Sequence, residues 1–447
     1  MSVEVAERSI EVLIEEGPAD EALLLHLFGG EPLLNFALLQ HVVEYGKRRA
    51  AEASRQIDIE LTTNGTRFTP AVIDFLNQHA IRVGVSFDGP PEVQDVARPA
   101  RQGSSHAAAE PGIRRFLASR AGTELATKTH CSVVVTRREL DLAKIVDHLE
   151  GLGFERILLT PATDLTGKSH GLRVEDLPVI LAAYDVLAER SEAARLEGRS
   201  TSVVWFDTLW TRLLSGKRQT QFCGGGRDYL GVAADGEVSL CYRFYQNGDY
   251  AMGNVFDGIT RSEAVDQVLV PLDQRTACSQ CWARHFCGGG CHHENLVTTG
   301  RLGDPNPVTC EILRHGMGRT LSTWGRLVAA GKITTRSVAR CEGPLSNEDE
   351  RNMATDGAEI DSNEKPKTKA TCHVRDVGVE CVVYEPTVHE VVFLNATAAW
   401  IFDQCDGSRS VEDIVADMAL RYAAPIETLR KDLVETLSMF RRKGLLV

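Results

Sequence analysis

Seven of the twelve cysteines of this chain are gathered in one segment, and they are the residues best able to do chemistry. They are Cys223, Cys241, Cys278, Cys281, Cys287, Cys291 and Cys310. Thiols so close in sequence usually bind metal or form disulfides, and a chain of 447 residues can bury a core without disulfides. Met1 to Gly17 is acidic and helix-like, unlike a secretory signal. We therefore interpret the cysteines as metal ligands.

The thiols leave the choice of metal open between zinc and iron. Zinc takes tetrahedral sites, whereas soft thiolates in this number suit two iron–sulfur clusters equally well. No histidine lies at zinc-finger spacing from the cysteines. We expect His292 and His293, beside Cys291, to lie at the surface rather than to bind or tune a metal centre.

Charge and hydropathy exclude other classes of protein. The formal net charge of −13 is opposite to the basic surface of a nucleic-acid binder. No apolar run approaches the roughly 18–20 residues that span a bilayer. We expect a cytoplasmic protein with no nucleic-acid or membrane partner.

The elements before the cysteines must position any other ligand-binding groups. Strands are predicted at residues 23–28, 57–63, 82–87, 129–136 and 156–161, with helices at residues 1–17, 33–47, 70–79, 111–118 and 140–152. This alternation predicts right-handed βαβ units and a parallel sheet, open or closed into a barrel. Because the chain opens on a helix, the strand expected before that helix is absent.

Several predicted strands end in polar or glycine-rich turns. The candidate ligand-binding residues at or beyond these ends are Gly29, Gly30, Glu31, Asn64, Ser86, Asp88 and Arg98. Taken singly, each is at least as well explained by a tight turn, a helix cap or an exposed side chain. In parallel α/β folds, however, a ligand lies over the carboxyl ends of the strands, where it could touch all of them.

The rest of the chain divides into further regions. A helix at residues 174–197 precedes a strand at 201–206, and a helix at 312–330 follows the cysteines. Residues 341–370 are polar and charged, which predicts a flexible linker. Strands at 379–384 and 390–394 and helices at 396–405, 411–422 and 426–443 then form a unit of winged-helix size.

The strand-end turns and the cysteine spacing together resemble the radical S-adenosylmethionine (SAM) enzymes. The sequences LFGGEPLL, LTTNGT and SFDGP, at residues 27–34, 61–66 and 86–90, are similar to successive strand-end motifs of that superfamily. The cysteines fit its SPASM extension (C-x9–15-G-x4-C, C-x2-C-x5-C-x3-C and a last cysteine) at every interval. The resemblance favours iron–sulfur clusters over zinc. It implies a partial (β/α)6 barrel without its first strand over residues 1–200 and a SPASM domain over 201–330.

The resemblance also implies a role for each candidate residue. The methionyl amino group of SAM would be held by Gly29, Gly30 and Glu31. Its ribose or methionine part would face Asn64, Ser86 and Asp88, and its carboxylate would meet Arg98. An outer auxiliary 4Fe–4S cluster would be held by Cys278, Cys281, Cys287 and Cys310, and an inner one by Cys223, Cys241 and Cys291. With three thiolates, the inner cluster would keep an open iron site for a substrate thiolate, a water or another side chain.

One departure concerns the cluster that cleaves SAM. Radical SAM enzymes bind it with a C-x3-C-x2-C loop after the first barrel strand, whereas this sequence has no cysteine before Cys131, which we expect to be a buried strand residue. The motif is absent either because the chain is truncated or its start site is called too late, or because this homologue has kept only its auxiliary clusters. A third 4Fe–4S cluster is expected only in a longer chain. The 447 residues alone are not expected to cleave SAM reductively.

Residues 371–447 resemble a second family, the PqqD-like peptide-recognition domains. The resemblance rests on FLNATAA at residues 393–399, CDGSRSV at 405–411 and the ending RRKGLLV. It implies that the leader of a precursor peptide binds as an added strand at a sheet edge. A DNA-binding winged helix is the alternative, disfavoured by the modest basic cluster of the last helix.

Together the resemblances imply an oxidoreductase that matures a ribosomal peptide or a peptide-derived cofactor. Hydrogen abstraction would lead to thioether or carbon–carbon cross-links, with electrons from a flavodoxin or ferredoxin. Tyr242 stands where sulfatase-maturing relatives carry an acidic residue proposed as a base, which argues against sulfatase maturation. The alternatives are a catalytically inactive iron–sulfur and peptide-binding scaffold and a zinc-containing regulatory protein.

Overall fold

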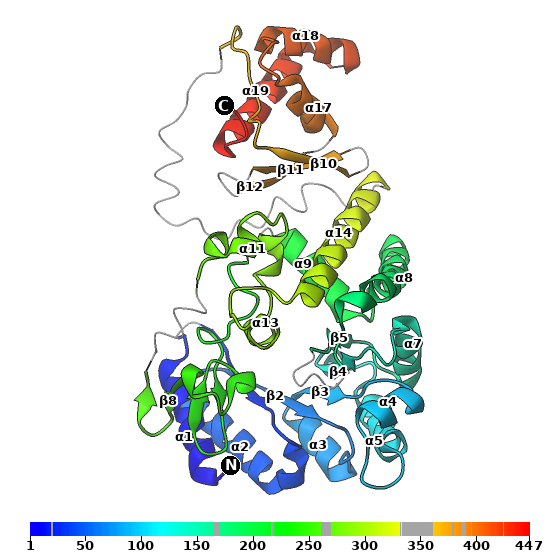
Figure 1. Ribbon diagram of the computed structural model, residues 1–447, viewed down its shortest axis with the longest axis vertical. Helices are drawn as coiled ribbons and strands as arrows, with labels where there is room; N and C mark the ends of the chain where they lie inside the picture. The colour runs from blue at the N-terminus through cyan, green and yellow to red at the C-terminus, as the bar shows by residue number, and fades with distance from the viewer. Residues whose placement is uncertain are drawn as a thin grey trace. The chain divides into compact units, whose positions relative to one another are not determined.

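The computed structural model describes residues 1–18, 21–163, 170–215, 219–260, 270–330, 332, 361–377, 380–385, 390–394, 396–422 and 424–447 (Figure 1). Residues 1–209 and 218–317 form one compact unit, and residues 210–217 and 318–447 form another. Each unit is described by itself below.

The first unit is built on a five-stranded parallel sheet whose strands follow the sequence order. The strands are β1 (Leu23–Leu27), β2 (Ile57–Thr63), β3 (Arg82–Ser86), β4 (Thr129–Val135) and β5 (Ile157–Pro161). Parallel neighbours need crossover connections, and helices supply them. The α/β class is confirmed, and each of the five strands lies within one residue of its predicted ends.

Helices precede, connect and follow these strands, as Figure 1 shows in blue to green. They are α1 (Val3–Glu16), η1 (Pro32–Asn35), α2 (Phe36–Glu52), α3 (Pro70–Gln78), α4 (Pro91–Ala97), α5 (Ser105–Arg120), α6 (Glu124–Thr127), α7 (Leu142–Leu152), η2 (Val174–Asp176) and α8 (Leu177–Leu196). Side-chain oxygens of Thr69 and Asp141 cap α3 and α7. The helix predicted to begin at Pro111 begins earlier, at Ser105, because the hydroxyl of Ser104 caps it and the proline lies inside.

The two faces of the sheet differ in chemistry. Alternate residues such as Leu61, Val83 and Val133 are buried in a core shared with α2, α3, α5 and α7. The residues between them carry the polar side chains of His26, Thr62, Ser86, His130, Ser132 and Thr160. A parallel sheet covered by apolar layers on both faces reads as continuous hydrophobic runs, so this polar face is available for a ligand rather than for packing.

The strand predicted at residues 201–206 is wrong. Val203 forms a single bridge with Ile157, and helix α9 (Val204–Ser215) begins at the next residue. The ring of Trp205 packs against that of Tyr184, with centroids 4.6 Å apart. The apolar run is therefore used for helix packing rather than for strand pairing.

The cysteine-rich region belongs to the same unit as the parallel sheet. It contains an antiparallel sheet of β6 (Gly231–Val232), β7 (Glu237–Ser239), β8 (Ala251–Asn254) and β9 (Gly258–Ile259). Its helices are η3 (Tyr242–Phe244), η4 (Gly248–Tyr250), η5 (Leu272–Gln274), α11 (Thr276–Ser279), α12 (Arg284–Cys287), α13 (His292–Thr299) and the long α14 (Pro307–Ala329). Val5 and Val12 of α1 share a core with Val238 and Phe244, so the first helix anchors this region.

The C-terminal residues form a three-stranded sheet and three helices around their own core. Strands β10 (His373–Val377), β11 (Glu380–Glu385) and β12 (Glu390–Leu394) pair antiparallel in that order. Helices α17 (Ala396–Gln404), α18 (Val411–Arg421) and α19 (Ile426–Arg442) follow, close to their predicted bounds. The sequence does not predict β10, because its residues HVRDV carry two charges and are held by pairing with β11.

The segment expected to be a flexible linker is described only from residue 361, and residues 341–360 lie outside the described residues. Residues 361–370 are hydrogen bonded to the C-terminal fold. The N–H of Thr368 donates to the carbonyl of Cys405 at 2.8 Å, and that of Lys369 to the carbonyl of Leu445 at 2.9 Å. These residues therefore extend that fold, because backbone pairing does not need the apolar side chains that they lack.

Candidate functional site

The first group of candidate residues lies where β1 and β2 end. The carboxylate of Glu31 accepts hydrogen bonds from the hydroxyl of Thr63 (2.8 Å) and from the N–H groups of Asn64 (2.8 Å) and Leu33 (3.1 Å). It thereby ties the turn after β1 to the end of β2 and caps η1. A Cβ atom on Gly29 or Gly30 would meet nothing within 4 Å. The turn is fixed through Glu31, while its glycines face open space.

Asn64 and Gly65 build the next turn. The Oδ1 atom of Asn64 accepts hydrogen bonds from the N–H and hydroxyl of Thr66, at 3.0 and 2.7 Å. Gly65 has a φ of +75°, and a Cβ there would lie 2.8 Å from Ile113, so the turn requires glycine. This is the turn-forming role of Asn64, and its ligand-binding role stays a prediction.

Asp88 and Arg98, beyond β3, bind each other. Nε and Nη2 of Arg98 donate to the two carboxylate oxygens of Asp88 at 2.7 and 3.2 Å. The Asp88 side chain is 2% exposed and also accepts the N–H of Val134. A ligand carboxylate would therefore share Arg98 with Asp88. Ser86, half-buried at the end of β3, completes a group carried by three adjacent strands.

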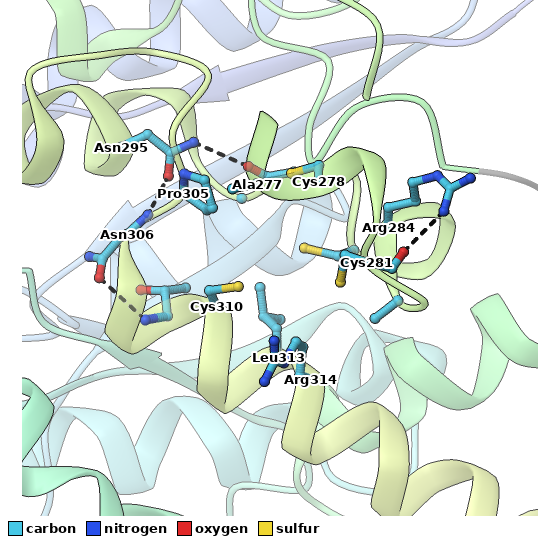
Figure 2. A pocket seen from close by; sticks show the side chains of 15 residues that line it. Ala277, Cys278, Cys281, Arg284, Asn295, Pro305, Asn306, Cys310, Leu313 and Arg314 are labelled. Atoms are coloured by element: carbon cyan, nitrogen blue, oxygen red, sulfur yellow. Dashed lines mark hydrogen bonds between the residues drawn. The ribbon is translucent and has the colours of Figure 1, made fainter. Parts of the chain in front are cut away.

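Four cysteines of the second group surround one cavity (Figure 2). They are Cys278 in α11, Cys281 after it, Cys287 at the end of α12 and Cys310 in α14. The pKa of the Cys310 thiol is raised to about 11, mainly by burial, with smaller contributions from the charges of Cys287 and Cys281. Burial raises the pKa of the Cys278 thiol, and the charge of Arg275 lowers it. The charges of Cys281 and Cys310 raise it to a smaller extent. The structure thus brings together the four cysteines expected to form the outer set.

Three glycines separate Cys287 from Cys291. Gly288, Gly289 and Gly290 have φ values of +81°, +89° and +76°. A Cβ on Gly288 would lie 2.3 Å from the backbone of Gln221, so close packing as well as φ requires glycine. Burial raises the pKa of the Cys287 thiol, whereas hydrogen bonds from the N–H groups of Gly289 and Gly290 lower it. Hydrogen bonds to sulfur of this kind tune iron–sulfur clusters.

The remaining cysteines of the segment, Cys223, Cys241 and Cys291, form a separate set. Burial is the main cause that raises the pKa of the Cys241 thiol, and the pKa of Cys291 is raised to about 11 by burial and the charge of Glu294. The charge of Cys223 contributes to both increases. Cys241 and Cys291 immediately precede η3 and α13, whose first N–H groups hydrogen bond to the two sulfurs and lower these pKa values. Cys223 is exposed.

A buried amide connects the two sets. Nδ2 of Asn295 donates to the carbonyls of Gly289 and Leu302 at 3.1 and 3.0 Å, and its Oδ1 accepts the N–H of Asn306 at 2.9 Å (Figure 2). Asn306 in turn accepts the N–H of Val308 at the start of α14, which carries Cys310. No sequence pattern indicated a role for Asn295. It lies four residues after Cys291, in the helix that follows that cysteine.

Charged side chains buried beside the thiols were also missed. Arg275 and Arg284 are 4% and 2% exposed. Nε of Arg284 donates to Asp273 at 2.8 Å and its Nη1 to the carbonyl of Cys281 at 3.2 Å. Beside the inner set, Nη1 of Arg243 donates to the buried Glu294 at 3.0 Å. From the sequence, charged side chains in a glycine- and cysteine-rich segment are expected to be exposed, because the sequence does not reveal which residues pack over them.

The two candidate groups are joined by a pair of aromatic rings. Phe28 directly precedes Gly29, and Tyr242 directly follows Cys241. Their ring centroids are 4.4 Å apart, yet Phe28 is 46% and Tyr242 43% exposed. The turn after β1 therefore lies beside the inner thiol set, with exposed aromatic surface between them.

The surface position expected for His292 is wrong. His292 is 4% exposed, and its Nδ1 lies 3.4 Å from the carbonyl oxygen of Leu302. Burial lowers the pKa of its imidazole to about 4, with a smaller contribution from the charge of Arg275, so the ring is neutral at pH 7. His293 packs edge-on against Phe244, with ring centroids 5.2 Å apart.

The donor set fits iron–sulfur clusters. The seven clustered cysteines are free thiols that form no disulfide. Within the described residues, no three His, Cys, Asp or Glu side chains converge closely enough to hold one metal ion. A cluster is larger than an ion, so its thiolates stand further apart around a cavity, as the outer set does. Buried cations and N–H donors at the sulfurs suit an anionic group there.

Three family models match separate parts of the chain. The radical SAM superfamily matches residues 1–122, the iron–sulfur cluster-binding SPASM domain residues 223–282, and coenzyme PQQ synthesis protein D residues 380–446. The chain therefore contains regions that match radical SAM, SPASM and PqqD-like domains.

Individual relatives agree with this class. The radical SAM cyclopropyl synthase TigE of Paramaledivibacter caminithermalis is 32% identical over 89 residues, which are 20% of this chain and 18% of the synthase. A cysteine-type anaerobic sulfatase-maturating enzyme of Clostridium perfringens strain 13 is 25% identical over 312 residues, 65% of this chain and 79% of that enzyme. The chain spans 34% and 18% of the lengths of the first two curated relatives that it matches.

Among solved structures, the chain is similar to native anSMEcpe with bound AdoMet. The TM-score is 0.60 at 19% identity, over 75% of this chain and 90% of that one. This similarity identifies the radical SAM fold. In the described part of the chain, every helix is too short or too polar to cross a membrane.

Proposed function

We propose that this chain acts in a cytoplasmic radical SAM maturase that modifies a ribosomal peptide or the peptide precursor of a cofactor. The modification is a thioether or carbon–carbon cross-link initiated by hydrogen abstraction. The observation that carries the proposal is the division of the seven clustered thiols into one set of four around a cavity and one set of three beside the turn after β1.

The ends of β1, β2 and β3 are the proposed SAM site. Gly29, Gly30 and Glu31 would receive the methionyl amino group, supported by the open space over the glycines and by the fixed carboxylate of Glu31. Asn64, Ser86 and Asp88 would face the ribose or methionine part. Arg98 would bind the ligand carboxylate while still held by Asp88. SAM, when cleaved reductively, supplies the radical that abstracts a hydrogen atom.

The two thiol sets are the proposed ligands of two auxiliary 4Fe–4S clusters. Cys278, Cys281, Cys287 and Cys310 would saturate the outer cluster. Cys223, Cys241 and Cys291 would leave one iron of the inner cluster without a cysteine. The exposed Cys223 and the exposed rings of Phe28 and Tyr242 support access of a peptide to this side. A small flavodoxin or ferredoxin is the proposed electron donor.

The C-terminal fold is the proposed docking site for the leader of the precursor peptide. A leader would add as a strand to an edge of the β10–β11–β12 sheet, where main-chain hydrogen bonds supply affinity. Tethering the leader raises the effective concentration of the core peptide at the barrel. A winged-helix geometry for this fold remains part of the proposal.

The proposal is tested by expressing the gene anaerobically with a small open reading frame next to it that encodes a candidate precursor. We expect the precursor to lose two hydrogen masses per cross-link, and to keep its mass when its leader is deleted. An unchanged precursor beside an iron-loaded protein would contradict the maturase and favour a peptide-binding scaffold. An iron-free protein would contradict the metal sites as well.

A further inference from the structure

Arg275 places a positive charge inside the protein beside the outer thiol set. It is 4% exposed, and its Nε donates to the carbonyl of Val270 at 3.0 Å. Its guanidinium packs on the glycine turn that follows Cys287, since a Cβ on Gly289 would lie 2.5 Å from Nη1. The side-chain carbons pack beside Gly303, whose Cβ position lies 3.8 Å from Cγ and 3.9 Å from Cδ. Packing thus fixes the position of this charge.

This charge lies beside the cavity that the outer thiols line. Gly289, on which the guanidinium packs, lines that cavity together with Cys278 and Cys287. Thiolates that carry a cluster bring negative charge into the cavity, and a buried cation beside it stabilises that charge.

We propose that Arg275 is a counter-charge of the outer iron–sulfur cluster and makes that cluster easier to reduce. The inference rests on the proposed function in that the four outer cysteines must bind a cluster. Reduction adds one electron and no proton, so the added negative charge is stabilised by a fixed cation nearby. In a medium of effective dielectric constant about 20, a unit charge roughly 10 Å away changes the reduction equilibrium on the order of tenfold.

Arg314 offers a matched control. It lines the same cavity and also acts on Cys310, but its side chain is 44% exposed and pairs with Glu311 at 3.0 Å. Water and salt screen an exposed charge. Removing Arg314 deletes one positive charge beside the same thiol set, so burial is the main difference between the two variants.

The test is a dithionite titration of the full chain, reconstituted anaerobically with iron and sulfide and followed by electron paramagnetic resonance (EPR). All variants carry Cys241→Ala, which removes an inner ligand so that the outer cluster is measured alone. We expect Arg275→Met to lower the one-electron reduction equilibrium constant on the order of tenfold, about 59 mV to more negative potential. Arg275→Lys should stay near the parent, and Arg314→Met should shift by less than about a third as much.

Equal shifts in Arg275→Met and Arg314→Met, or no shift in the former, would overturn the proposal. If Arg275→Met binds no iron while Arg275→Lys binds it at the parent potential, the need for a buried charge is supported. Loss of iron from both variants would instead show a packing role and overturn it. A parent chain without iron would contradict the proposed function itself, so the two failures are distinguishable.

Discussion

The outer and inner thiol sets interleave along one segment, yet their surroundings differ. The outer set lines a cavity between α11, α12 and α14, beside the buried Arg275 and Arg284. The inner set includes the exposed Cys223 and lies next to the exposed rings of Phe28 and Tyr242. Four enclosed ligands suit a cluster that only transfers electrons. Three ligands with an open side suit a cluster that meets the substrate.

Removing a ligand of one set should have the largest effect on the iron content. Cys287→Ala should abolish the outer cluster and leave the inner one, so about half of the iron and sulfide should be lost. Metal analysis and EPR measure this. Cys131→Ala is the control, because that buried thiol donates to the carbonyl of Phe87 in the parallel sheet and should keep the full iron content. Loss of all the iron from Cys287→Ala would show that the sets are not independent.

The glycine turn between the sets predicts the next largest effect. Gly288→Ala forces a Cβ to within 2.3 Å of the Gln221 backbone at a φ of +81°. Gly300→Ala has nearly the same φ, +77°, but meets no atom within 4 Å. Denaturant unfolding should show a loss of about 1–2 kcal/mol for Gly300→Ala and about 1–3 kcal/mol more for Gly288→Ala. Equal losses would contradict the close packing of this turn.

Asn295 links the segments that carry the two sets through hydrogen bonds. Removing its amide should therefore lower the free energy of unfolding. Asn295→Ala leaves the carbonyls of Gly289 and Leu302 and the N–H of Asn306 without this partner, at about 1–3 kcal/mol for a buried group left unsatisfied. The control is Asn254→Ala, whose bonds to Phe256 and Asp235 are exposed to water. It should cost less than about 1 kcal/mol. Similar unfolding free energies for the two variants would contradict this structural role of Asn295.

The smallest predicted effect distinguishes the open iron site of the inner cluster from the saturated outer cluster. Cyanide added to the reconstituted chain should bind the open iron of the inner cluster and change its EPR signal. The signal of the outer cluster, saturated by four cysteines, should stay the same, and Cys287→Ala identifies which signal is which. Mössbauer or pulsed-EPR spectra that assign four protein sulfurs to the inner cluster would contradict the open site.

Much of the framework could be predicted from the sequence. The five parallel strands follow from apolar runs separated by helical periodicity. The cysteine intervals, through the family resemblance, predict two sets of thiols, and the structure places the four thiols of the outer set around one cavity. Glu31 was found through its place in a strand-end motif, although its bonds to Thr63 and Asn64 depend on the neighbouring strand.

What could not be predicted depends on contacts between distant segments. Residues 201–206 have strand propensity, but Trp205 packs on Tyr184 and the segment becomes helical. Arg275 is buried by glycines of a later turn, and Phe28 meets Tyr242 from far along the chain. The charge of Asp88, expected to face a ligand, is balanced by Arg98. Local patterns carry no information about such partners.

The presence of two iron–sulfur clusters is tested most directly by the iron and acid-labile sulfide content of the anaerobically purified chain. Its Mössbauer spectrum identifies the cluster type. Two 4Fe–4S clusters predict brown protein with about eight iron and eight sulfide per chain. Colourless protein without iron or sulfide, or with about two zinc ions per chain, would contradict it.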